Sequence, residues 1–108
     1  MRDKTATSSD RLLAAIFGEM PTGVFDTSAL WETVDSLPIK RTGDALHWRY
    51  EHNMTYREIG MALGRWDDPL IPIKYAAARN QVEEGLRRLR RPYWRRHFDL
   101  GLQARWGA

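Results

Sequence analysis

Apolar residues return at intervals of three and four along most of this chain, which is the spacing of amphipathic helices. The first such segment runs from Asp10 to about Glu19, with Ser9 as its expected N-cap. A second segment begins at a cap within 26–28 and ends before Pro38. The apolar stripe of the first segment suits either a core or a dimer interface, and it consists of Leu12, Leu13, Ile16 and Phe17.

The middle of the chain carries the clearest local signal. A third helix is expected from Ile39 or Asp44 to His52. Thr55 and Glu58 then form a T-x-x-E capping box, in which each side chain bonds the backbone amide of the other residue. This pattern predicts a short helix that ends at Gly64, the residue expected to form a left-handed C-terminal cap.

A turn-rich connector over 65–72, with two prolines, precedes a long helix predicted from Pro72 or Ile73 to Arg91. Its expected inner face comprises Tyr75, Ala78, Val82, Leu86 and Leu89. One more short helix is expected over 93–105, with Pro92 at its first position. Tyr93, Trp94 and Phe98 of the terminal segment are expected to pack on the core, with stacking on single-stranded bases as the alternative. Trp66 in the connector is also expected to pack on the core, and a partner surface is its alternative. No segment reads as a strand, so the fold class is all-α.

Length and composition place limits on this picture. The chain has 108 residues, which fits one small domain, alone or with an arm. It contains no cysteine, so disulfides, thiol catalysis and cysteine-based metal sites are excluded. The longest apolar run, Leu12 to Phe17, is too short for a membrane span and lacks the layout of a signal peptide. We therefore expect a cytoplasmic protein with no membrane partner.

The net charge of +3 conceals an asymmetry along the chain. From Lys74 onward nine basic residues face three acidic ones, a net charge of +6, whereas the first 73 residues carry eight basic against eleven acidic residues, a net charge of −3. Eight of the nine cations are arginines, whose planar guanidinium binds phosphate in two places at once. The segment therefore favours a polyanionic partner, with a solvated helix face as the alternative.

A short helix, a capped short helix and a longer basic helix follow one another in the order of a helix-turn-helix unit. Three further stretches accompany that order: Ser36-Leu37-Pro38, the run from Ala45 to Tyr50, and the ending Gly85-Leu86-Arg87-Arg88-Leu89-Arg90-Arg91-Pro92. Together with Thr55–Gly64 they make residues 36–92 similar to region 4 of sigma-70 family factors. The expected architecture is an N-terminal extension of two helices over 1–36 and a helix-turn-helix domain over 37–108.

The resemblance implies that the long helix reads promoter DNA and that the region also docks on RNA polymerase. The implied base-reading residues are Lys74, Tyr75, Arg79 and Asn80. The implied phosphate contacts are Thr55, Tyr56 and Arg57 in the middle helix and Arg87, Arg88, Arg90 and Arg91 in the long one. Two features depart from the family: the connector is several residues longer, and Gln81 stands at a position that is apolar there.

The leading hypothesis is a DNA-binding transcriptional regulator that reads double-stranded DNA with the helix Pro72–Arg91, from a bacterial or phage genome. It would act in the bacterial cytoplasm or in an infected host cell. One alternative is a modulator that binds RNA polymerase or a sigma factor, and another is a DNA-packaging protein similar to a small terminase subunit.

The histidines (His47, His52 and His97) lack metal-ligand spacing, and no nucleophile motif is present. We expect no metal, no cofactor and no enzyme activity.

Overall fold

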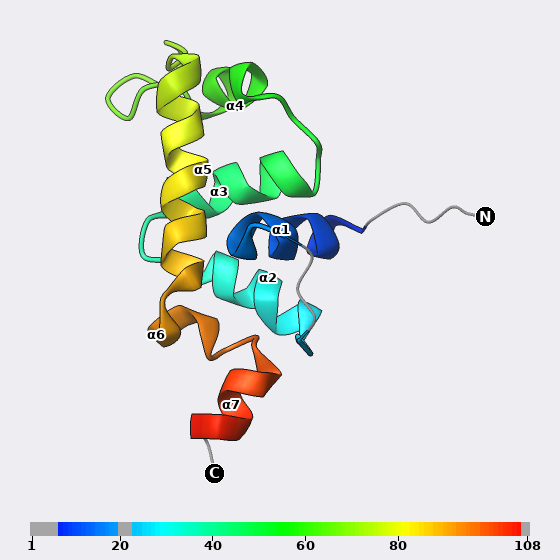
Figure 1. The fold of residues 1–108 in the computed structure, drawn as a ribbon. Helices are drawn as coiled ribbons and strands as arrows, with labels where there is room; N and C mark the ends of the chain where they lie inside the picture. The colour runs from blue at the N-terminus through cyan, green and yellow to red at the C-terminus, as the bar shows by residue number, and fades with distance from the viewer. Residues whose placement is uncertain (1–6, 20–22, 107–108) are drawn as a thin grey trace, which may run out of the picture.

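Helix α5 (Tyr75–Arg90) is the longest helix, and four other helices pack against it (Figure 1). The computed structural model describes residues 7–19 and 23–106. The other helices are α1 (Ser8–Phe17), α2 (Thr27–Asp35), α3 (Lys40–Tyr50), α4 (Tyr56–Leu63), α6 (Pro92–Arg95) and α7 (Leu100–Trp106). The one β-type pairing among the described residues is an isolated bridge between Phe25 and Asp99. The all-α prediction is confirmed.

Side-chain caps set the start of three helices. Asp26 caps α2 and Thr55 caps α4, both within the predicted set, and the Thr55–Glu58 capping box is complete. The predicted cap Ser9 is wrong, because Thr7 begins α1 with a capping box of its own. Thr7 and Asp10 have the same T-x-x-D/E spacing as Thr55 and Glu58. A capping box of two reciprocal hydrogen bonds stabilises the helix start more than the single hydroxyl of Ser9 would.

Three predicted boundaries need correction. Helix α5 begins at Tyr75 rather than near Pro72, and Tyr75 is 57% exposed instead of facing inward. Gly64 has a positive φ of 65°, but its ψ of 176° is extended, so it does not form the left-handed cap. The terminal segment splits into α6 and α7 instead of forming one helix, although Pro92 does occupy the first position of α6.

One core joins the N-terminal helices to the rest of the chain. The stripe of α1 is buried there, except for half-buried Phe17. Leu46 from α3, Ile59 from α4 and Leu89 from α5 are completely buried in the same cluster. The stripe therefore serves as core, not as a free interface.

Trp66 is 84% exposed, which contradicts its expected packing on the core, whereas Phe98 is completely buried as expected. Trp94 packs half-buried against the core, but Tyr93 is 60% exposed.

Arginines from neighbouring helices cap three helix ends. The last carbonyls of a helix lack intrahelical donors and carry partial negative charge, so a guanidinium stabilises them. Helices α1 and α4 have no basic residue in their own last turn and rely on these distant arginines. The donors and acceptors are Arg11 to the Tyr50 carbonyl (2.6 Å), Arg41 to the Gly64 carbonyl (2.7 Å) and Arg90 to the Ile16 carbonyl (2.5 Å). Several of the chain's cations therefore hold the fold together.

Candidate nucleic-acid interface

Helices α3, α4 and α5 pack against one another, and α4 leads through the connector into α5 (Figure 1). The segment that enters α5 lies directly on α4, since the Ile73 amide donates to the Gly60 carbonyl at 3.1 Å. A Cβ atom at Gly60 would stand 2.5 Å from the Ile73 carbonyl oxygen, so glycine permits this close approach. The rings of Tyr56 and Tyr75 meet edge to face at 5.3 Å. These contacts fix the first turn of α5 relative to α4.

The first two turns of α5 are open to a partner. Lys74 occupies the N-cap position without a side-chain cap bond, and the first turn contains no acidic residue. The backbone amides at this end are therefore available to an anion. The side chains of Lys74, Arg79 and Asn80 are exposed and form no hydrogen bond or ion pair with the described residues. All four predicted base-reading residues, including Tyr75, thus lie exposed at one end of one helix.

The start of α4 is less open than its sequence indicates. The Thr55 hydroxyl accepts from the Glu58 amide at 3.1 Å, and the Glu58 carboxylate accepts from the Thr55 amide at 2.8 Å. This carboxylate adds a negative charge where the sequence predicted a phosphate contact. Tyr56 lies half-buried beneath the guanidinium of Arg49, 4.2 Å from the ring centroid. Arg57 remains exposed and forms no ion pair with the described part of the chain.

Arg57 and Lys74 line the same shallow hollow between α4 and the start of α5. The hollow has a volume of 520 Å³, and Met61, Pro72, Ile73 and Tyr75 complete its lining. Two unpaired cations beside an uncapped helix start make this the most favourable place for a phosphate along these two helices.

The predicted row of phosphate-binding arginines is mostly engaged within the protein. Arg87 and Arg88 both form ion pairs with Glu84, the second at 3.0 Å. Arg90 donates to the last carbonyls of α1. Arg91 is exposed and has no such partner among the described residues. The pairs with Glu84 follow from spacings of three and four residues, which the sequence already shows.

His47 forms a bridge that sequence reasoning missed. Its Nε2 atom lies 2.7 Å from Asp35 Oδ1 of α2, its Nδ1 atom bonds Glu51, the C-cap residue of α3, and its ring packs on Trp31 at 4.9 Å. Burial lowers the pKa of His47, but the hydrogen bonds and charges of Glu51 and Asp35 outweigh it and raise the pKa above 6.5. Among the described residues, no group of three or more histidine or carboxylate side chains is placed to hold a metal ion.

The His47 bridge predicts a pH-dependent stability. Because folding raises the pKa of His47, its contribution is complete below the unfolded pKa near 6.5 and is lost as the pH rises through the folded value. We expect a loss of less than about 1 kcal/mol, since the carboxylates are partly exposed. Urea unfolding from about pH 5.5 to about pH 8.5 measures it, and His47→Gln should flatten the profile in that range. An unchanged slope in the variant would contradict the assignment.

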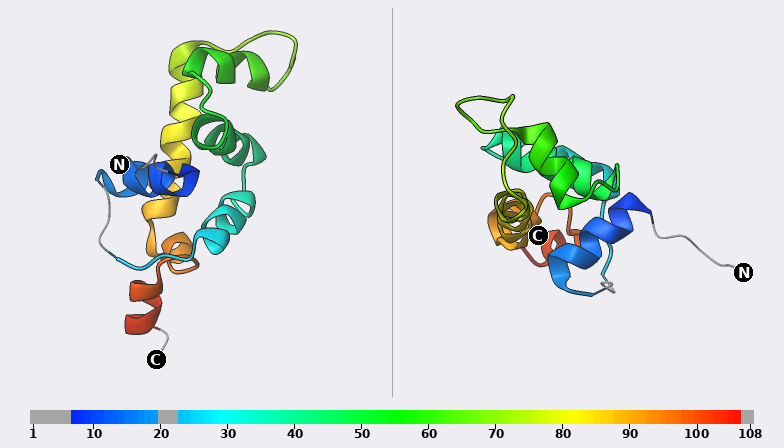
Figure 2. Two further views of the ribbon diagram at one scale, coloured as in Figure 1. Left: turned by 90° about the vertical axis from the view of Figure 1, so that its right-hand side faces the viewer. Right: turned by 90° about the horizontal axis from the view of Figure 1, so that it is seen from above.

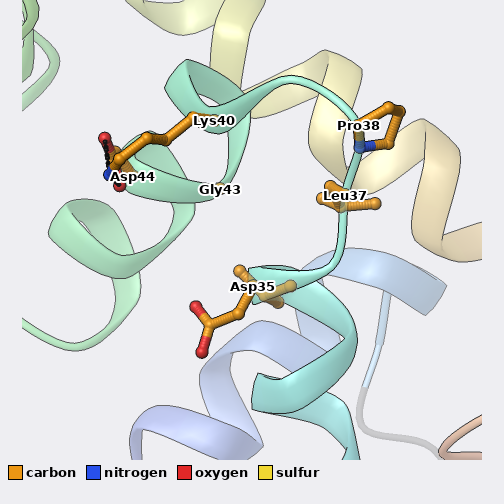
Figure 3. Close-up of a pocket in the computed structure, with 7 residues that line it drawn as sticks. Asp35, Leu37, Pro38, Lys40, Gly43 and Asp44 are labelled. Atoms are coloured by element: carbon orange, nitrogen blue, oxygen red, sulfur yellow. Dashed lines mark hydrogen bonds and ion pairs between the residues drawn. The ribbon is translucent and has the colours of Figure 1, made fainter.

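A second hollow lies between the end of α2 and the start of α3 (Figure 3). It has a volume of 380 Å³. Its charged side chains already have partners: Lys40 pairs with Asp44 at 3.1 Å, and Asp35 pairs with His47. This hollow therefore offers no uncommitted charge to a ligand.

None of the described helices combines the length and the apolar character needed to cross a membrane. Comparison with known proteins finds no matching family model, no matching curated protein and no matching solved structure.

Proposed function

We propose that this protein binds double-stranded DNA as a transcriptional regulator, with α4 and α5 as its helix-turn-helix. The observation that carries the proposal is the start of α5, where Lys74, Arg79 and Asn80 are exposed and unpaired around an uncapped helix end without acidic residues. An arginine and an asparagine side by side suit guanine and adenine, the two bases that these side chains bind through paired hydrogen bonds.

In this proposal the first two turns of α5 enter the major groove. Arg79 and Asn80 contact base edges, while Arg57 and Lys74 hold one phosphate of the adjoining backbone. Arg91 follows Asn80 by eleven residues, about 16 Å along the helix, and contacts a phosphate further away. Arg90 has no part in DNA contact, because it caps α1.

Selection from a random pool of duplex DNA tests the proposal. At about 0.15 M salt, purely electrostatic binding is weak, so an enriched motif identifies a sequence-specific reader. Recovery of unselected sequences would contradict base reading and would favour the alternative of a modulator that binds RNA polymerase or a sigma factor. A ring-sized oligomer in light scattering would instead favour the alternative of a DNA-packaging protein.

Two arginine variants separate base reading from phosphate contact. Arg79→Ala is expected to lose about 1–3 kcal/mol of discrimination at one base pair of the selected motif. Arg91→Ala is expected to weaken binding to all sequences alike and to reduce the salt dependence. Titration of each variant with the motif and its single-base substitutions measures both effects. Equal loss on every sequence for Arg79→Ala would remove its base-reading role.

A further inference from the structure

The connector between α4 and α5 is an ordered loop, held by its own backbone. The Arg65 amide donates to the Ile71 carbonyl at 2.7 Å and closes the loop at its base. Inside it, the Ile71 amide donates to the Asp68 carbonyl at 3.0 Å, and the Asp68 side chain accepts from the Leu70 amide at 3.1 Å. Figure 2 shows the loop standing away from the helices in both views. The loop is therefore ordered before any partner binds, so binding costs the loop little conformational entropy.

Large apolar side chains are concentrated in and beside this loop. Trp66 is 84% exposed, Leu70 is 91% exposed and Ile71 is 43% exposed. Met61, just before the loop, is 57% exposed. Of the nine large hydrophobic residues that are exposed in the described part of the chain, five lie between Met61 and Tyr75. Exposed apolar residues gathered in one place indicate a contact surface, whereas scattered ones do not.

We propose that this connector loop is a homodimer contact. Its exposed apolar side chains, Trp66 and Leu70 above all, pack on the same side chains of a second copy across a two-fold axis. In such an interface the same surface meets itself, so it must be self-complementary. Trp66 and Leu70 satisfy this requirement because apolar surface pairs with apolar surface. The stripe of α1 is excluded from this role by its burial in the core.

The charges of the loop favour a second copy over DNA. The loop carries Arg65 against Asp67 and Asp68, a net charge of −1, which DNA phosphates would repel. Because both signs are present, an arginine of one copy can face an aspartate of the other. Within one copy, Arg65 pairs with Asp67 at 2.8 Å, and both side chains are more than 40% exposed. Either side chain is therefore free to pair with the second copy instead.

The available area matches a weak dimer. The four exposed side chains offer on the order of 500 Å² per copy, so two copies bury about 1,000 Å² in total, the lower limit for a specific interface. We therefore expect a weak dimer that forms only as the concentration of the chain rises. The proposal goes beyond DNA binding and stands without it. Where both hold, the loop joins two copies close to the start of each α5, as a paired reader of two half-sites requires.

Sedimentation equilibrium of the whole chain from about 1 to 500 μM tests the proposal. The wild-type chain is expected to change from monomer to dimer, whereas the double variant W66A/L70A stays monomeric throughout. The matched control is Tyr93→Ala, which removes a residue that is 60% exposed but lies outside the loop, and it should associate like the wild type. Circular dichroism confirms that each variant keeps its helices.

Three results would overturn the proposal. The first is a wild-type chain that stays monomeric at all concentrations. The second is a W66A/L70A variant that associates as strongly as the wild type. The third is a Tyr93→Ala variant that loses association as completely as W66A/L70A. A monomeric chain whose affinity for DNA falls in W66A/L70A would assign the loop to DNA, and a monomeric chain that loses polymerase binding in the same variant would assign it to that protein. Neither result bears on whether α5 reads bases, because the selection experiment measures that separately.

Discussion

Replacing Gly64 by alanine is expected to lower the free energy of unfolding by about 3 kcal/mol or more. Gly64 combines a φ of 65° with a ψ of 176°, a region that only glycine occupies readily. A Cβ atom there would stand 2.2 Å from the carbonyl oxygen of Pro69 and 2.7 Å from its Cα atom. These are backbone atoms of the closed connector, so no side-chain rotation relieves the clash.

Urea unfolding of Gly64→Ala measures the effect, and Gly18→Ala is its matched control. Gly18 also has a positive φ, 83°, but apart from its own helix and chain neighbours no atom of the described residues lies within 4 Å of the position of an added Cβ. Its replacement should therefore cost only the strain of the left-handed conformation, about 1 kcal/mol. Similar losses for the two variants would show that the approach of Pro69 to Gly64 adds nothing. A wider connector in the surviving folded state should also weaken the proposed association of two copies.

The parts of the fold that the sequence predicts well are those determined by neighbouring residues. The capping box of Thr55 and Glu58 spans three residues, and both of its hydrogen bonds form as predicted. Asp26 and Pro92 occupy their expected helix positions for the same local reason. Where two local signals compete, as Thr7 and Ser9 do at the start of α1, the pattern with two reciprocal bonds prevails.

The features that sequence reasoning missed depend on partners far along the chain. Arg90 belongs to a run of arginines typical of phosphate binding, but its acceptor, the Ile16 carbonyl, lies 74 residues away. Core packing is the favoured expectation for Trp66, yet the connector closes on its own backbone and leaves the ring exposed, as the alternative of a partner surface requires. Helix α5 begins at Tyr75 because the Lys74 backbone is extended, with a ψ of 157°, and the preceding segment is held on α4 by the hydrogen bond from the Ile73 amide to the Gly60 carbonyl.

In the candidate site, too, some features follow from neighbouring residues and others depend on residues far along the chain. The exposure of Arg79 and Asn80 follows from helical periodicity, since Ala78 and Val82 mark the buried face of α5 and neither of the two exposed residues lies on that face. The partnership of Arg57 and Lys74 does not follow from it, because the connector separates these residues and only the tertiary contact brings them to one hollow. The sequence therefore names these cations and the open face of α5, and the structure adds that Arg57 and Lys74 lie at the same hollow.

Phe98→Ala is expected to cost about 3–5 kcal/mol, the usual loss for a fully buried aromatic side chain. Phe98 is completely buried, and its ring lies 6.4 Å from that of Phe25. Its carbonyl accepts from the Asp26 amide at 2.9 Å, and the Leu100 amide donates to Val24 at 3.0 Å. The residue thus anchors the C-terminal segment to the segment that leads into α2.

Thermal and urea unfolding of Phe98→Ala measure this loss against Tyr93→Ala, whose ring is 60% exposed and should cost less than about 1 kcal/mol. Because α1, α2 and α5 share one core with Phe98, the unfolding of the variant should remain a single cooperative transition at a lower midpoint. A first transition confined to α6 and α7, with the rest of the chain at its original stability, would show that Phe98 holds only the terminal segment. A single shifted transition would mean instead that the surface of α5 proposed to read DNA depends for its stability on a residue at the far end of the fold.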